Sequence, residues 1–137
     1  MSSVARSRPI KLSASCNARW WQRAIRGSTS ILVLDVGGTI AGYATLGLNR
    51  ARSLPQEGEI YELYLLPEYQ GIGLGKRLFN ETRKLLASLG CEGTVVWCLE
   101  DNLPAVDFYR GRGGRDIAEG TEVFDGQPVR KLAFVWK

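Results

Sequence analysis

The 137-residue sequence contains no histidine, only one methionine and only three cysteines. The absence of histidine excludes nucleophilic catalysis by a Ser-His or Cys-His pair. The cysteines, Cys16, Cys91 and Cys98, lack CxxC spacing, so no metal site is expected. Three thiols without such spacing favour reduced cysteines and predict a cytoplasmic location.

Long apolar runs are also missing. No run approaches the roughly 18 residues that a membrane span requires, so no contact with a membrane is expected. No apolar stretch follows the basic residues near the N-terminus, which argues against a secretory signal. A net charge of +4 suits an anionic small molecule. Nucleic-acid binding would rest on charge alone and is disfavoured.

The hydrophobic content of 45% and the length fit one globular domain. The sequence predicts a loose N-terminal arm over residues 1–15 and a single domain over residues 16–137. Periodicity and turn residues predict the elements of that domain in chain order. They are a helix at 16–26, a hairpin of strands 31–36 and 39–46, a loop at 49–58, a strand at 59–66, a helix that Gly90 ends, a strand at 94–99, a short helix that Asn102 caps, and a hairpin of strands 115–124 and 129–136.

The order strand, helix, strand across residues 59–99 implies a right-handed parallel crossover. The two hairpins add antiparallel pairs. The sequence therefore predicts an α+β fold in three layers, with a mixed and mostly antiparallel central sheet.

A glycine-rich segment, residues 70–75, lies between a predicted strand and a helix. Its three glycines allow successive N–H groups to point at one position, and the helix that follows adds its own unpaired N–H groups, which together suit a phosphate. A Walker A loop is excluded because Gln70 replaces its first glycine and Arg77 replaces its Ser or Thr. A dinucleotide-binding fingerprint is excluded because Lys76 replaces its last glycine. A plain tight turn remains the alternative.

Four segments in order, 59–67, 70–75, 102–105 and 108–109, together resemble the GNAT superfamily of N-acetyltransferases. The resemblance covers about residues 16–136 and is strongest over 58–111. It implies acetyl-coenzyme A (acetyl-CoA) as cosubstrate, and a gap for its pantetheine arm where strands 59–66 and 94–99 splay apart.

The resemblance also implies roles for individual residues. Asn102 would contact the coenzyme arm, and Tyr109 would protonate the departing thiolate. The alternatives are a plain helix cap for Asn102 and a core tyrosine for Tyr109. The remaining coenzyme contacts would come from the strand, at Leu63, Leu65 and Leu66, with an oxyanion donor near Leu65, and from the pyrophosphate loop, at Gln70, Gly71, Ile72, Gly73, Leu74, Gly75 and Lys76.

An amine attacks a thioester only after losing a proton, so a base or a water relay is required. Glu59 lies eleven residues before Gln70, where histone-type members of the family carry their catalytic glutamate, and is the favoured base. Glu62 and a water relay are alternatives, and a surface role for Glu59 is a further one. The odd separation of the two glutamates predicts that they point to opposite faces of the strand.

The sequence departs from the family pattern in two places. Few residues precede the first hairpin, so the usual cover over the acceptor site is short or rebuilt. Gly113 and Gly114 stand where Gly-Phe is usual, which predicts looser packing near Tyr109. Five aromatic residues are either acceptor-pocket walls or core: Trp20, Trp21, Tyr43, Tyr64 and Trp97.

The predicted function is direct transfer of an acetyl group to a primary amine of a small molecule, a peptide or a protein. Cys98 is expected to be a buried strand residue without an activating partner, which disfavours a covalent acyl-enzyme. The alternative function is an acyl-CoA-binding sensor without turnover. A homodimer that pairs through the final hairpin is a further expectation, by analogy with similar proteins.

Overall fold

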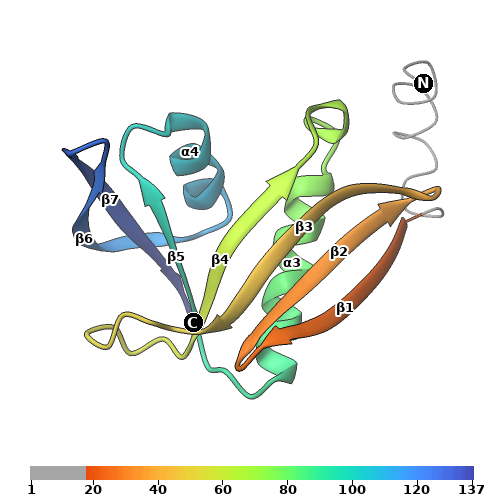
Figure 1. Cartoon of the computed structure of the whole chain (residues 1–137), viewed down its shortest axis with the longest axis horizontal. Helices are drawn as coiled ribbons and strands as arrows, with labels where there is room; N and C mark the ends of the chain where they lie inside the picture. The colour runs from red at the N-terminus through yellow and green to blue at the C-terminus, as the bar shows by residue number, and fades with distance from the viewer. Residues whose placement is uncertain (1–17) are drawn as a thin grey trace.

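The computed structural model describes residues 18–137. These residues form one seven-stranded sheet and two α-helices (Figure 1). The N-terminal arm predicted over residues 1–15 lies outside the described residues. The strands are β1 (Ala18–Arg26), β2 (Thr29–Val36), β3 (Thr39–Leu48), β4 (Gly58–Leu65), β5 (Thr94–Leu99), β6 (Arg115–Phe124) and β7 (Gln127–Trp136), and the helices are α3 (Leu74–Ser88) and α4 (Leu103–Gly111).

The strand order in the sheet is β1-β2-β3-β4-β5-β7-β6. All neighbouring strands are antiparallel except β4 and β5, which are parallel. These two strands pair only from Gly58 opposite Thr94 to Ile60 opposite Val96, and they then separate. We call this separation the fork (Figure 1). The predicted α+β fold, its mixed and mostly antiparallel sheet and its splayed central strands are confirmed.

The helix predicted over residues 16–26 is wrong where the structure describes it, because residues 18–26 form strand β1. Trp20 lies opposite Leu34, and Trp21 lies opposite Val33, so the two indoles point to opposite faces of the sheet. A short apolar segment fits the helical and the strand period almost equally well. Pairing with β2, together with the preference of tryptophan for strands, decides between them.

Helix α3 places its apolar stripe on the sheet, as the sequence predicts: Leu78, Phe79, Leu85 and Leu86 are all buried. Its last turn is followed by Gly90 at φ 90°, the expected stop signal. The other predicted strands, the Asn102-capped helix and the loop after β3 are also present, with small shifts at their ends.

Both helices pack on the same face of the sheet. Phe79 of α3 and Tyr109 of α4 belong to one buried cluster with Ile60, Val96 and Phe134 from three strands. The described residues thus supply two of the three expected layers. None of their helices has the length and apolar character needed to cross a membrane.

The opposite face carries no helix within residues 18–137. Its small buried cluster consists of Val95, Ala133 and Val135, with Leu54 from the loop before β4 packed against it. Within residues 18–137, this helix-free face is therefore covered at one end by a loop and by no helix.

The looser packing predicted at residues 113–114 is wrong. A Cβ atom on Gly114 would lie 2.5 Å from Cζ2 of Trp136, so the indole fills the space that a side chain would take. The indole Nε1 of Trp136 donates a hydrogen bond to the carbonyl of Arg112 at 3.0 Å. A strand far along the chain therefore supplies the bulk that the local sequence lacks.

Candidate active site

The glycine-rich segment follows β4 and leads into α3. Gly71 and Gly73 have φ angles of 80° and 89°, and Gly73 is the N-cap of the helix. Such angles favour glycine. A Cβ atom at either position would meet nothing within 4 Å, so conformation and not space requires glycine here. The first N–H groups of α3 lack partners within the helix and are available to an anion.

Side chains at both ends of this segment fix it to the fold. The side-chain amide nitrogen Nε2 of Gln70 donates a hydrogen bond to the carbonyl of Leu65 at 2.9 Å, which connects the loop to the end of β4. Tyr69 and Leu74 are buried together in one cluster. Leu74 can therefore contact a coenzyme only through its backbone. Ile72 and Lys76 are exposed, and Gly75 lies in the first turn of α3.

Beyond Ile60, the edge of β4 that faces β5 has no strand partner in the described structure. Leu63 and Leu65 lie on this free stretch. Leu66 is different, because its N–H donates to the carbonyl of Ala41 at 2.8 Å and its carbonyl accepts from the N–H of Tyr69 at 2.9 Å. Of the three predicted contacts to the pantetheine arm, Leu63 and Leu65 thus have the better access.

Asn102 caps α4, since its side-chain oxygen accepts a hydrogen bond from the N–H of Ala105 at 3.3 Å. The predicted N-cap at Asn102 is therefore confirmed, and its contact with the coenzyme stays a prediction. Its amide nitrogen is the group left for the predicted coenzyme contact.

Tyr109 lies on the inner side of α4, within van der Waals reach of aromatic side chains from α3 and β7. Burial, and to a smaller degree the nearby thiol of Cys98, raises the pKa of Tyr109 to about 12. The phenol therefore keeps its proton at neutral pH. Cys98 lies on β5 just past the point where the fork opens.

Glu59 is 2% exposed, although glutamate is rarely buried. It lies where β4 and β5 are still paired, opposite Val95. Its carboxylate accepts hydrogen bonds from the backbone N–H of Arg50 at 2.9 Å and from that residue's Nη2 at 3.0 Å. Burial with a specific charge partner marks a candidate catalytic residue.

The prediction that the two glutamates point to opposite faces is wrong. A β-bulge leaves Tyr61 without a partner on β3, so Glu59 lies opposite Gly47 and Glu62 lies opposite Thr45. Positions 45 and 47 share one face of β3, and both glutamates therefore point to the helix-free face. Glu62 is exposed there and accepts a hydrogen bond from the Thr45 hydroxyl.

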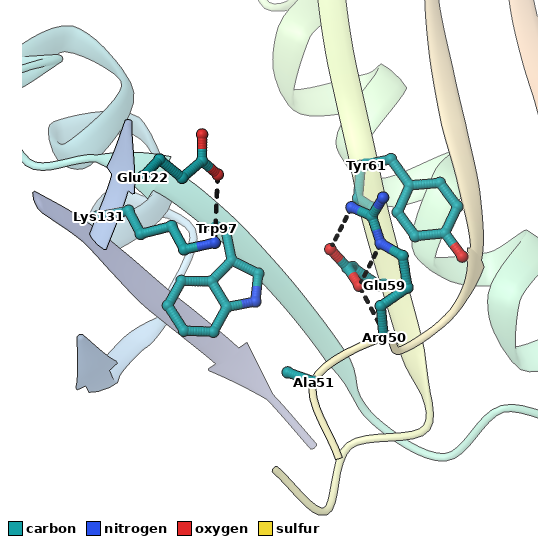
Figure 2. Close-up of a pocket in the computed structure, with 8 residues that line it drawn as sticks. Arg50, Ala51, Glu59, Tyr61, Trp97, Glu122 and Lys131 are labelled. Atoms are coloured by element: carbon teal, nitrogen blue, oxygen red, sulfur yellow. Dashed lines mark hydrogen bonds and ion pairs between the residues drawn. The ribbon is translucent and has the colours of Figure 1, made fainter. Parts of the chain in front are cut away.

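A pocket of about 440 Å³ opens on the helix-free face beside Glu59. Figure 2 shows two groups of side chains facing each other across it, Arg50, Glu59 and Tyr61 on one side and Trp97, Lys131 and Glu122 on the other. We call it the acceptor pocket. It is lined by Arg50, Ala51, Glu59, Ile60, Tyr61, Trp97, Glu122 and Lys131.

The far wall comes from strands beyond the fork. The ammonium of Lys131 lies 4.6 Å from the centre of the Trp97 ring and 3.2 Å from a carboxylate oxygen of Glu122. The pocket is thus lined by two carboxylates, two cations and two aromatic rings, those of Tyr61 and Trp97. Such a site suits a small polar molecule that carries charges of both signs.

The five aromatic residues proposed from the sequence divide into three groups. Trp97 lines the acceptor pocket. Trp20 packs against the buried clusters on the helix-covered face. Trp21, Tyr43 and Tyr64 lie in one row across the helix-free face, because Trp21 and Tyr43 both lie opposite Val33 and Tyr64 lies opposite Tyr43.

Sequence reasoning missed three charged pocket residues, Arg50, Glu122 and Lys131. Arg50 lies in the loop before β4, and the other two lie on the final hairpin. None belongs to a periodic pattern or a motif, so the only available signal was their charge. Among residues 18–137 there is no group of three or more Cys, Asp or Glu side chains that could hold a metal ion.

The acetyltransferase (GNAT) family model matches residues 4–113. An uncharacterized N-acetyltransferase of Bacillus subtilis, YuaI, is 28% identical over 118 residues, which is 86% of this chain and 66% of that protein. Thialysine N-epsilon-acetyltransferase of Sus scrofa is 34% identical over 76 residues, 53% of this chain and 45% of that protein. The chain thus spans about half to two thirds of the length of these relatives.

Among solved structures, NAA60 of Arabidopsis thaliana in complex with acetyl-CoA superposes with a TM-score of 0.66 at 19% identity, over 81% of this chain and 77% of that chain. That similarity concerns the fold alone. The family model covers most of the sequence and confirms the resemblance predicted from its motifs. The chain therefore belongs to the acetyltransferase (GNAT) family.

Proposed function

We propose that this chain transfers the acetyl group of acetyl-CoA to the primary amine of a small molecule. The observation that carries the proposal is the arrangement at the fork. The free edge of β4, which leads to the glycine-rich segment, begins at the three-residue pairing of β4 and β5. The acceptor pocket with Glu59 adjoins the same pairing. A thioester in the fork would be within reach of an amine in the pocket.

The coenzyme would bind through backbone groups. Its pyrophosphate would accept hydrogen bonds from N–H groups of residues 70–76, and its pantetheine arm would lie along β4 at Leu63 and Leu65. An N–H group near Leu65 would polarise the thioester carbonyl as negative charge develops on the oxygen. Asn102 would contact the arm from the N-terminus of α4.

In the transfer itself, Glu59 takes a proton from the ammonium, directly or through water. The neutral amine forms the C–N bond as the C–S bond breaks, and the coenzyme leaves as a thiolate. Tyr109, which is protonated at neutral pH, donates its hydroxyl hydrogen to the sulfur. The acylated nitrogen then loses its second proton, and the tyrosinate takes up a proton through water, which restores the phenol. Burial raises the pKa of Cys98, so this thiol is a poor nucleophile, which supports direct transfer over an acyl-enzyme.

The charges of the pocket support a small acceptor with an acid group besides its amine. Lys131 would face the acid group, and Glu59 would face the amine. One relative is named for acetylating the ε-nitrogen of thialysine, an amino acid, and this agrees with such an acceptor. Peptides and proteins remain alternatives that the same experiment tests.

The test is release of coenzyme A thiol from acetyl-CoA with a panel of amines: thialysine, lysine, a polyamine and a lysine-containing peptide. We expect the amino acids to react best, and the Glu59→Gln variant to be nearly inactive. A preference for the peptide or the polyamine would contradict the proposed acceptor class. No thiol release with any amine would contradict the transferase function.

An acyl-CoA-binding sensor is the second candidate, and one observation favours it: Arg50 already neutralises the glutamate that would act as base. A sensor would bind acetyl-CoA tightly, in the micromolar range or below, and release no thiol. Calorimetric titration beside the thiol assay separates the two functions.

We also propose pairing of two copies through the final hairpin. Strand β6 is an edge of the sheet, and Val123 and Phe124 at its end are 70% and 49% exposed. An exposed apolar edge strand favours pairing with another chain. Light scattering on the purified protein would give a dimer mass, and a monomer would contradict this pairing. The cytoplasmic location stays a prediction.

A further inference from the structure

The contact between Arg50 and Glu59 joins two side chains in opposite environments. The Glu59 side chain is 3% exposed and that of Arg50 is 70% exposed. Three donors of Arg50 converge on the carboxylate: the backbone N–H and Nε reach Oε1 at 2.9 and 3.4 Å, and Nη2 reaches Oε2 at 3.0 Å. The carboxylate is thereby held in one orientation.

Arg50 itself is fixed from a second side. Its guanidinium carbon lies 4.2 Å from the centre of the Tyr61 ring, and the Tyr61 hydroxyl donates a hydrogen bond to the carbonyl of Leu48 at 2.6 Å. Tyr61 is the residue that the β-bulge of β4 leaves without a partner on β3. The bulge therefore places the ring that supports the arginine beside the glutamate that the arginine holds (Figure 2).

A buried carboxylate without a partner protonates, because burial disfavours its charged form. A protonated Glu59 could not act as a base. The other charged or titratable groups that line the pocket are Arg50 and Tyr61 on the side of Glu59, and Glu122 and Lys131 on the opposite side. Lys131 is already paired with Glu122, so Arg50 is the cation that compensates the Glu59 charge in the described structure.

Oε1 accepts two hydrogen bonds from Arg50, whereas Oε2 accepts one. A carboxylate oxygen can accept two, so Oε2 retains one acceptor position. We propose that Arg50 is a positioning residue, which compensates the buried charge of Glu59 and turns the open position of Oε2 to the acceptor's ammonium. This inference rests on the proposed transferase function.

The kinetic test compares the pH profile of kcat/KM for the wild type, Arg50→Met and Arg50→Lys. Loss of the cation should move the acidic limb of the profile to higher pH by about one unit or more. Lysine keeps a point charge but lacks the several N–H donors of the guanidinium, so Arg50→Lys should show a smaller shift with a lower kcat. Arg52→Met, in the same exposed loop, is the matched control and should keep the wild-type profile.

A profile of Arg50→Met that coincides with the wild type would overturn the proposal, even if kcat falls, because a purely structural arginine would change the amount of folded enzyme and not its titration. A shift in Arg52→Met of equal size would also overturn it, because the effect would then come from general loop charge.

A second measurement does not need turnover. Removing Arg50 should destabilise the protein at pH 8 more than at pH 5, because Glu59 in the variant can take up a proton at the lower pH and lose its unpaired charge. In a Glu59→Gln background the same substitution should show no such pH dependence. Equal destabilisation at both pH values would overturn the proposal that Arg50 compensates the charge of Glu59, whether or not the wild type transfers acetyl groups. Absence of thiol release with an intact stability cycle would contradict the proposed function alone.

Discussion

The glycine-rich segment after β4 and the acceptor pocket lie on either side of one fork, yet they are built differently. The segment offers backbone N–H groups from residues adjacent in sequence, held by two glycines at positive φ. The pocket offers side chains from a loop and four strands, which are far apart in sequence. The glycine-rich segment therefore depends on local conformation, and the pocket depends on how distant strands are brought together.

Glu59→Gln tests the acceptor side and carries the largest expected effect. Loss of a general base should lower kcat by roughly 10²- to 10⁴-fold. Affinity for acetyl-CoA, measured by calorimetry, should be unchanged, because Glu59 lies in the pocket and not in the loop. Glu62→Gln, on the same face of β4 but exposed, is the control and should retain most activity. Equal losses in both variants would contradict the assignment of Glu59 as the base.

Gly73→Asp tests the coenzyme side. An aspartate at φ 89° is strained, and its charge repels the pyrophosphate. We expect acetyl-CoA affinity to fall on the order of 100-fold, about 2.7 kcal/mol. Gly126→Asp is the matched control, since Gly126 also has a positive φ of 76° and open space around it but lies in the β6–β7 turn. Unchanged affinity in Gly73→Asp would contradict a phosphate site at this loop.

Tyr109 is buried, and the effect of this burial on stability can be measured by alkaline unfolding. The pKa of Tyr109 is about 12 in the folded protein, against an ordinary value of 10.0. Between these values the unfolded chain releases the proton first, so the free energy of unfolding should fall as pH rises from 10 to 12, by at most about 2.7 kcal/mol. Below pH 10 this contribution is fully present.

Tyr109→Phe should lack that alkaline loss, and the difference between the two proteins isolates it from other groups that titrate in this range. The same variant should slow acetyl transfer if the hydroxyl donates to the departing sulfur. An identical alkaline loss in both proteins would mean that the phenol is not buried as described.

Gly114→Ala tests the packing behind Tyr109 and carries the smallest expected effect. The new Cβ atom would lie 2.5 Å from the Trp136 ring, so we expect destabilisation of about 1–3 kcal/mol, measured as a lower Tm. Gly111→Ala, at the end of α4 with open space around it, is the control and should be neutral or slightly stabilising. A neutral Gly114→Ala would show that the tryptophan can move aside.

Prediction from the sequence worked best where a pattern is local. The stripe of α3, the cap at Asn102 and the glycines at 71 and 73 each follow from a few neighbouring residues, and each is present in the fold. It failed at residues 18–26, where the apolar spacing fits a helix and a strand alike, and pairing with β2 decides.

Prediction from the sequence also failed for the direction of the side chains on β4, because a β-bulge depends on the register with the neighbouring strand. Without the bulge, Glu59 and Glu62 would lie on opposite faces. Likewise, the predicted loose packing near Gly114 ignored Trp136, which arrives from the end of the chain.

The family, the glycine-rich segment and the choice of Glu59 as candidate base could be predicted from the sequence alone, because glycine conformation, helix termini and motif spacing act over short distances. The charges that meet Glu59 were set by the tertiary structure. Arg50 reaches it from a loop, and Lys131 and Glu122 reach the far wall from the last hairpin. The physical reason is that an ion pair depends on separation in space, which strand order and register set and which no local pattern records.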